Sequence, residues 1–391
     1  MSNRTSSHTH QTVPDLLGMM RELLAEISVS STSPQWDTGN RTVIDKLAEW
    51  LAALGFRCEV IPLEGKTNKA NLIATLGSGP GGLVLAGHTD TVPFNEERWE
   101  MNPLTLTERD NKLFGLGSTD MKGFFPIAIE AAKTFLDQPL KEPLIILATA
   151  DEESSMDGAR QLAAQGHPKA RFAVIGEPTD LKPIRMHKGI MLESVTVQGR
   201  AGHSSNPNLG VNAMEAMHVV MSDLLAFRAE LQERYHNPLF AVSVPTLNLG
   251  CIHGGDNPNR ICGQCELHFD LRALPGMNNE ELHNELQQRL QPRAKQLNVN
   301  ISLRALANHI QPYEQPADSE LVKYAEQLTG HSADAVAFAT ESPFMQQLGM
   351  QTIVMGPGSI DQAHQPNEYM ALSQVQPAVK LFRQLIGRFC L

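Results

Sequence analysis

The chain has 391 residues, of which 41% are hydrophobic and 19% charged, and its formal net charge is −11. This length and composition are typical of a globular protein with two or three domains. The acidic excess argues against nucleic acid or an anionic membrane as the main partner, because both are negatively charged. The five cysteines are odd in number and scattered, which indicates free thiols in a reducing compartment.

The N-terminal segment, from Met1 to Pro14, is polar and lacks the apolar stretch of a signal peptide. The rest of the sequence contains no apolar run long enough to span a membrane. These two features predict a cytoplasmic protein without a membrane partner.

Apolar periodicity predicts two N-terminal helices followed by alternating strands and helices. Such alternation favours a mainly parallel mixed sheet with helices on both faces, which is an α/β fold. The predicted elements are helices 14–27 and 43–54, strands 56–62, 71–76 and 83–88, helix 123–135, strand 144–150, helix 158–164 and strand 172–175.

The pattern changes after Pro183. Segments 191–198, 212–233, 246–252, 265–274, 278–290 and 299–306 read β-α-β-β-α-β, which suits a small sheet with two helices on one face. The α/β pattern then returns with helix 318–328, strands 335–339 and 352–355, and helix 373–389. We therefore predict one α/β domain from 1–183 and 307–391, with an α+β domain, 184–306, inserted into it.

Acidic residues and histidines follow the predicted strands of the α/β domain at their carboxyl ends, the edge where open α/β sheets bind ligands. Any single one could be a solvated loop residue, but their repeated placement at one edge indicates a site. Histidines and carboxylates without cysteine suit zinc or a similar divalent ion, and there are enough for two ions that share a carboxylate. The residues are His88, Asp90, Asp120, Asp151, Glu152, Glu153, Glu177 and His364.

Six passages carry a resemblance to a known family: 86–93, 115–125, 148–153, 175–179, 202–205 and 356–366. With them the chain resembles, over nearly its whole length, the aminoacylase/carboxypeptidase-type family of two-zinc amide hydrolases. Segments 246–250, 252–256 and 259–262 resemble in particular the members that hydrolyse N2-acetyl-L-ornithine to L-ornithine and acetate in arginine biosynthesis.

The resemblance implies a zinc-peptidase-like catalytic domain and an inserted lid and dimerisation domain. It implies two divalent metal ions per subunit, zinc by expectation and cobalt as the alternative. His88 and Glu177 would hold one ion and Glu153 and His364 the other, with Asp120 bridging them. Glu177 stands where many relatives carry aspartate, and both residue types ligate metals.

Three further residues receive catalytic roles from the resemblance. Asp90 would orient the metal-ligating histidine two residues before it. Glu152 would be the general base that acts on the metal-bridging water or hydroxide. In the homodimers of the family, a lid histidine reaches the active site of the neighbouring subunit, and His203 matches it.

The substrate would be a small N-acetyl amino acid. Asn259 and Arg272 match lid residues that hold its carboxylate, although an arginine on an alternating strand is also typical of a solvated face. Glu341 follows the predicted strand 335–339, so its carboxylate could attract the ammonium group of ornithine. The alternative for Glu341 is that it caps the short helix that starts near Ser342.

Metal-binding motifs do not separate this activity from that of related amidohydrolases, such as a succinyl-diaminopimelate desuccinylase or a dipeptidase. A protein of a different class, a catalytically dead relative that binds metal as a scaffold, is a further alternative. The presence of Glu152 beside the expected ligand Glu153 argues against it, because a scaffold has no need of a base.

Overall fold

The structure is a computed structural model that describes residues 13–391, and it forms two compact units. The first unit runs to Arg185 and includes Gln315–Ala333 and Thr340–Leu391, and the second consists of Met186–Glu314 and Asp334–Ala339. The polar segment 1–12, which entered the prediction about a signal peptide, lies outside the described residues. Among residues 13–391, no helix is both long and apolar enough to cross a membrane.

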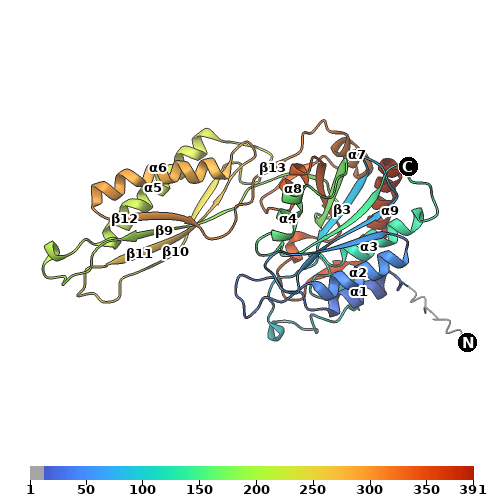
Figure 1. The fold of residues 1–391 in the computed structure, drawn as a ribbon, viewed down its shortest axis with the longest axis horizontal. Helices are drawn as coiled ribbons and strands as arrows, with labels where there is room; N and C mark the ends of the chain where they lie inside the picture. Colours follow the sequence, from blue (N-terminus) through green and yellow to red (C-terminus); the bar gives the residue numbers. More distant parts are fainter. Residues whose placement is uncertain (1–12) are drawn as a thin grey trace, which may run out of the picture. The chain divides into compact units, whose positions relative to one another are not determined.

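One sheet forms the centre of the first unit (Figure 1). Seven of its nine strands, in their order across the sheet, are β1 (Arg57–Pro62), β2 (Ala70–Leu76), β6 (Leu144–Thr149), β3 (Leu83–His88), β7 (Phe172–Pro178), β15 (Gln351–Gly356) and β8 (Ile184–His187). The four strands β6, β3, β7 and β15 are parallel, and the strands on either side of them are antiparallel. This mixed sheet confirms the predicted α/β fold class.

The four parallel strands are apolar along most of their length because both faces of the sheet are covered. In β3 every residue is buried, and His88 pairs in register with Thr149 of β6. Since parallel strands all end at one edge, the polar residues that follow them are brought together there.

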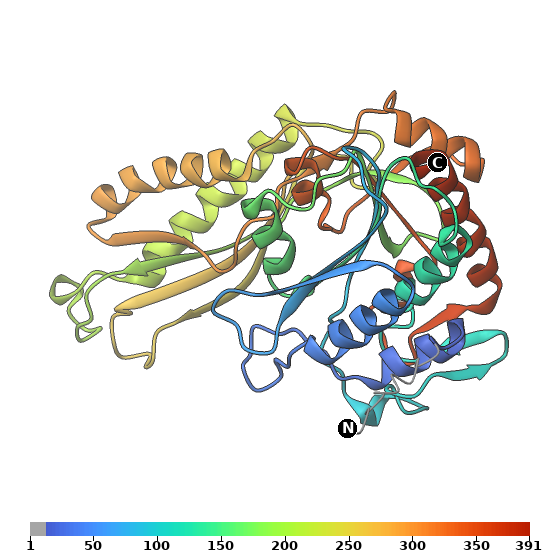
Figure 2. The ribbon, with the colours of Figure 1, turned by 45° about the vertical axis from the view of Figure 1, so that its right-hand side comes forward.

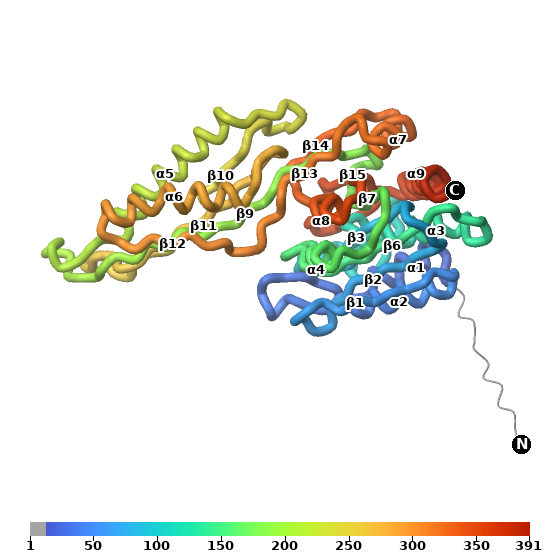
Figure 3. Tube along the Cα trace, turned by 45° about the horizontal axis from the view of Figure 1, so that its top comes forward, coloured from blue at the N-terminus to red at the C-terminus, as the bar shows by residue number. Residues whose placement is uncertain are grey.

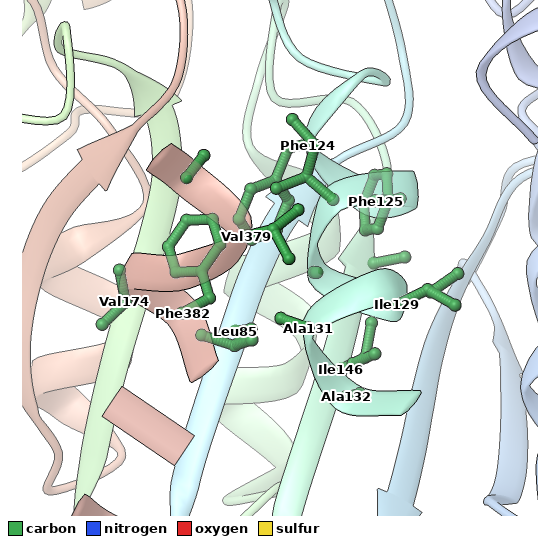
Figure 4. Close-up of a cluster of buried hydrophobic side chains, with 14 of the residues drawn as sticks. Leu85, Phe124, Phe125, Ile129, Ala131, Ala132, Ile146, Val174, Val379 and Phe382 are labelled. Carbon is green, nitrogen blue, oxygen red and sulfur yellow. The ribbon is translucent and has the colours of Figure 1, made fainter. Parts of the chain in front are cut away.

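Helices on one face of the sheet enclose the main core (Figure 2). They are α1 (Leu16–Ala25), α2 (Arg41–Ala53), α3 (Phe124–Ala132), α7 (Glu320–Thr329) and α9 (Leu372–Cys390). Helix α3 has eight of its nine residues buried, as expected for a helix packed between the sheet and two other helices. Figure 4 shows side chains of α3 and α9 meeting Leu85 of β3 and Val174 of β7.

Two further helices, α4 (Asp157–Gln165) and α8 (Ser342–Gln347), pack against each other and contribute no residues to this core. A small antiparallel sheet in the order β16 (Tyr369–Ala371), β5 (Lys112–Phe114) and β4 (Thr107–Arg109) also belongs to the first unit. It pairs Tyr369 with Phe114, so it joins the segment after His364 to the glycine-rich turn that carries Asp120. These three short strands were not predicted from the sequence. The 3-10 turns of the first unit are Glu96–Arg98, Lys133–Phe135 and Ile360–Gln362.

The second unit is a four-stranded antiparallel sheet with helices α5 (Ala213–Arg234) and α6 (Asn279–Leu297) along one face (Figure 3). Its strands, in spatial order, are β10 (Thr246–Gly254), β11 (Gln264–Arg272), β9 (Met191–Gln198) and β12 (Asn300–Ala305). This confirms the predicted β-α-β-β-α-β order. The unit also contains β13 (Tyr313–Glu314), which pairs with Met186 and His187, together with β14 (Asp334–Val336) and the 3-10 turn Pro207–Leu209.

Several predicted boundaries were wrong, among them those of α6 and β14. Helix α6 continues through Pro292 to Leu297, whereas 290 was predicted as its end. Leu297 packs on the core of this unit, and such packing offsets the hydrogen bond that a proline removes. The predicted strand 335–339 is only the three-residue β14. All five cysteines are free thiols, as predicted.

Candidate active site

The carboxyl ends of β3 and β7 bring His88 and Glu177 together, and the turn before α3 adds Asp120. His88 Nε2 lies 3.0 Å from Asp120 Oδ1 and 3.7 Å from Glu177 Oε1. All three side chains are buried, and their potential ligand atoms lie within 4.8 Å of one another. Each triad of this kind offers the imidazole and carboxylate donors that one divalent ion uses.

A second triad shares Asp120 with the first. His364 Nε2 lies 3.0 Å from Glu153 Oε2 and 3.4 Å from Asp120 Oδ2. These ligand atoms also lie within 4.8 Å of one another, so Asp120 has one oxygen directed at each histidine. His364 is the exposed member, with 55% of its side chain accessible, so this triad is open to solvent.

A sharp turn after β6 decides which of three consecutive acids enters the cluster. Asp151 adopts a left-handed conformation (φ 62°), which ends the strand abruptly. Its carboxylate forms ion pairs with Lys66 and Lys69, away from both triads. Glu153 lies in the second triad, and Glu152 lies close enough to Glu177 for their charges to interact. Asp151 is therefore a structural acid.

Burial is the main effect on the pKa values of the acids in the cluster, and their mutual charge adds to it. Burial raises the pKa of Glu152 well above its usual value, and the negative charge of Glu177 raises it further. Burial likewise raises the pKa of Glu177 well above normal, against the positive charge of His88. For Asp120 burial opposes ionisation, but the hydrogen bond and charge of His88 outweigh it, and its pKa is lowered. A bound cation would stabilise the ionised form of these buried carboxylates.

The donor set therefore fits two divalent ions: two imidazoles, at least three carboxylates, one carboxylate between them, and no thiolate within either triad. His88 and Glu177 are the terminal donors of one triad, and Glu153 and His364 are those of the other.

Asp90 contacts His88 differently from the sequence expectation. His88 Nδ1 lies 2.9 Å from the main-chain oxygen of Asp90 and 3.8 Å from its carboxylate. The carboxylate instead accepts a hydrogen bond from the main-chain N–H of Glu153, at 3.0 Å. Asp90 thus connects the end of β3 to the turn after β6.

Glu341 is buried at the same sheet edge. The hydroxyl of Thr149, the last residue of β6, donates to Glu341 Oε2 at 2.9 Å, while Oε1 has no hydrogen-bond partner among the described residues. Glu341 is also the N-cap residue of α8, as the alternative expected, but its side chain makes no capping hydrogen bond. Burial raises the pKa of Glu341 to about 7.

Glu368, which no sequence pattern singled out, holds the turn that carries Asp120. The Glu368 side chain is 2% exposed and accepts hydrogen bonds from the main-chain N–H groups of Gly117 (3.0 Å), Thr119 (2.8 Å) and Asp120 (3.0 Å). Burial and the charge of Asp120 raise its pKa to about 8. In the sequence, Glu368 is marked only by its position four residues after His364. That spacing does not predict its hydrogen bonds to the turn that carries Asp120.

His203, Asn259 and Arg272 all belong to the second unit. His203 is exposed, and its Nδ1 accepts hydrogen bonds from the N–H and hydroxyl of Ser205, at 3.2 and 2.8 Å. The main-chain oxygen of Asn259 accepts from Ser204, so Asn259 lies beside the His203 loop. Arg272 ends β11 and donates to Asp270 at 2.9 Å.

A groove of about 800 Å³ opens beside His364 in the first unit. Aromatic side chains line part of it, including Trp36, Phe94 and Trp99. Because His364 belongs to both the groove wall and the second triad, a small molecule in the groove can reach the cluster.

Comparison with known proteins identifies the family. Residues 84–388 match the profile of Peptidase family M20/M25/M40. The chain belongs to this family. Over 378 residues it is 49% identical to acetylornithine deacetylase of Pasteurella multocida, covering 97% of this chain and 99% of the relative. It is also 48% identical to acetylornithine deacetylase of Klebsiella pneumoniae, with 97% and 98% covered. The family predicted from the motifs is confirmed.

Solved structures of M20-type proteins share the fold. The M20 family metallo-carboxypeptidase of Sulfolobus solfataricus superposes with a TM-score of 0.75 at 18% identity, covering 95% of this chain and 98% of the other. A Bacillus subtilis protein described as a dinuclear metal-binding M20 peptidase gives a TM-score of 0.68 at 13% identity, with 95% and 96% covered. At these identities the likeness concerns the fold alone.

Proposed function

We propose that this chain is a metal-dependent amidohydrolase that converts N2-acetyl-L-ornithine into L-ornithine and acetate, in the cytoplasmic pathway of arginine biosynthesis. The observation that carries the proposal is the near-full-length identity of 49% to an acetylornithine deacetylase, combined with two triads that share Asp120. The fold and family alone would also suit a peptidase, so the choice of substrate rests on the sequence identity.

The metal ligands are assigned as the two triads suggest. His88 and Glu177 would hold one ion and Glu153 and His364 the other, and Asp120 would be shared between them, with zinc as the expected metal and cobalt as the alternative. When bound, divalent ions supply Lewis acidity to the acetyl carbonyl and make a water molecule easier to deprotonate. Asp90 keeps the His88 ring in place through its main-chain oxygen, which fixes the ring nitrogen that faces the cluster.

Glu152 is the general base. It lies among the acids but in neither triad, so its carboxylate remains available for proton transfer. It takes a proton from the attacking water and delivers it to the leaving amine of ornithine. Burial and the charge of Glu177 raise its pKa, which makes it a better proton acceptor than an ordinary glutamate once it is ionised.

His203 supplies a hydrogen bond to the developing oxyanion of the neighbouring subunit in a homodimer. Its Nδ1 accepts from Ser205, so in the neutral ring Nε2 carries the proton and can act as a donor. Asn259, beside this loop, and Arg272 bind the carboxylate of the substrate. Glu341, with one oxygen still lacking a partner among the described residues, favours the ornithine ammonium.

The test is a substrate panel on the purified, metal-loaded protein. N-acetylornithine should give a kcat/KM well above those of succinyl-diaminopimelate and dipeptides. Higher activity on either of the other two would reassign the substrate within the family. Activity on none of them, with metal bound, would favour the scaffold alternative.

Glu152→Gln provides the matched control. It should keep the bound metal and most of the substrate affinity while kcat falls by roughly 10²–10⁴, the usual contribution of a general base. Loss of metal in this variant would mean that Glu152 is a ligand.

A further inference from the structure

A carboxylate lies on the apolar face of the sheet in the second unit. Glu193 of β9 lies between Met191 and Val195 on the same face of the strand, and all three residues have 0% exposure. Residues two apart on a strand share a face, so Glu193 points into the apolar layer between the sheet and the helices. A carboxylate in such a place is unfavourable unless it is paired or binds a cation.

Two histidines from other segments meet this carboxylate. His283 Nδ1, from α6, lies 2.8 Å from Glu193 Oε1, and His309 Nε2, from the loop after β12, also lies 2.8 Å from it. The ligand atoms of the three residues lie within 4.8 Å of one another. The His283 and His309 side chains are 24% and 12% exposed, so the cluster is accessible to an ion from solvent.

Two buried oxygens beside this cluster lack hydrogen-bond partners among the described residues. One is Oε2 of Glu193 and the other is Oδ1 of Asn279. Asn279 lies one helical turn before His283, and its amide nitrogen donates to the main-chain oxygen of Ile310, the residue after His309. Buried acceptors without donors are unfavourable, and a bound cation or a water molecule that it holds would satisfy them.

We propose that Glu193, His283 and His309 bind a divalent transition-metal ion, with zinc as the expected species, at a site in the second unit. Two imidazoles and one carboxylate form a known three-residue donor set for zinc, and water would occupy the fourth position. The bound ion would connect β9, α6 and the His309 loop, and would therefore stabilise this unit.

Formation of the site requires the two ring nitrogens to move away from Glu193 Oε1. Ligands about 2.0–2.1 Å from a tetrahedral zinc are roughly 3.3 Å apart, so each ring nitrogen must move by about half an ångström from Oε1. The nitrogens that now face Oε1 would become the ligands, and each ring would carry its proton on the opposite nitrogen.

The test measures zinc bound per full-length chain by equilibrium dialysis and elemental analysis. Wild type should bind one more zinc ion than the His283→Gln/His309→Gln double variant or Glu193→Gln. His218→Gln is the matched control, because His218 is an exposed histidine of the same unit on α5 and should leave the count unchanged. Zinc should also raise the unfolding temperature of wild type more than that of the cluster variants.

A reciprocal variant keeps the test independent of the proposed catalytic ions and of any misfolding of the cluster variants. The double variant His88→Ala/His364→Ala changes only residues of the first unit and should still bind one zinc ion. If it binds none, the proposal is overturned. Equal zinc counts in wild type and folded cluster variants would also overturn it, and would make the three residues a hydrogen-bonded group only.

Discussion

The turn that carries Asp120 depends on one buried carboxyl group, and Glu368→Gln tests that dependence. Glu368 Oε1 accepts from the N–H groups of Thr119 and Asp120, and Oε2 accepts from Gly117. A glutamine keeps one carbonyl oxygen, but its nitrogen offers only N–H donors. The substitution therefore sets a donor against the N–H of Gly117.

The expected loss of folding free energy follows from the number of hydrogen bonds that the substitution removes. One buried N–H loses its acceptor, which costs about 1–3 kcal/mol of folding free energy. Because Asp120 belongs to both triads, a displaced turn should also weaken metal binding by roughly 10–100-fold, as seen when groups that support metal ligands are removed. Saturating zinc or cobalt should then restore most of the kcat/KM for N-acetylornithine.

The assays are chelator competition for metal affinity, deacetylation with and without added metal, and urea unfolding. Glu142→Gln is the matched control, since Glu142 accepts a hydrogen bond from the main-chain N–H of Gly81 and belongs to neither triad. It should keep the wild-type metal affinity, because glutamine retains one oxygen that can accept from Gly81. Wild-type metal affinity in Glu368→Gln, or the same loss in both variants, would refute the reasoning.

His203, Glu341 and His187 each provide one more prediction. Variants His203→Ala and Glu152→Gln should each be nearly inactive alone but regain activity in mixed dimers, because one of the two sites is then intact; no recovery after verified subunit exchange would remove His203 from a neighbouring site. Glu341→Gln should lower kcat/KM roughly ten- to hundredfold on N-acetylornithine but hardly on N-acetylnorvaline, given about 1.5–3 kcal/mol for a charged contact; equal losses would make Glu341 structural. Burial lowers the pKa of His187 from 6.5 to about 4, so the free energy of unfolding should fall by up to about 3 kcal/mol as the pH drops through that interval, when the unfolded chain gains a proton that the folded one does not bind. His187→Gln should flatten this part of the curve in urea unfolding, and an unchanged pH dependence would contradict the assignment.

Glu341 lies at the sheet edge where the sequence placed it, but the strand that was expected to carry it there was predicted wrongly. The expected strand 335–339 would have delivered it to the sheet edge, but β14 is short and belongs to the second unit. Glu341 instead reaches the edge from the start of α8 and is held by Thr149. Sequence periodicity located the residue correctly but could not identify what would hold it.

Local sequence patterns were sufficient for the fold class and for the edge at which the acids and histidines gather. Apolar strands that alternate with helices form a parallel core, and the residues that follow such strands must meet at one edge. His88, Glu153 and Glu177 could therefore be placed near one another from their positions after apolar strands alone. These inferences need only local patterns and a general rule about sheets.

Long-range packing, in contrast, assigns different roles to neighbouring acids. Asp151 is removed from the cluster by a left-handed turn and by two lysines more than 80 residues away in sequence. Glu368 contacts the glycine-rich turn about 250 residues before it in sequence. Glu193, His283 and His309 come from three separate segments and contact one another. Contacts of this kind depend on how segments distant in sequence pack together, and local periodicity does not predict that packing.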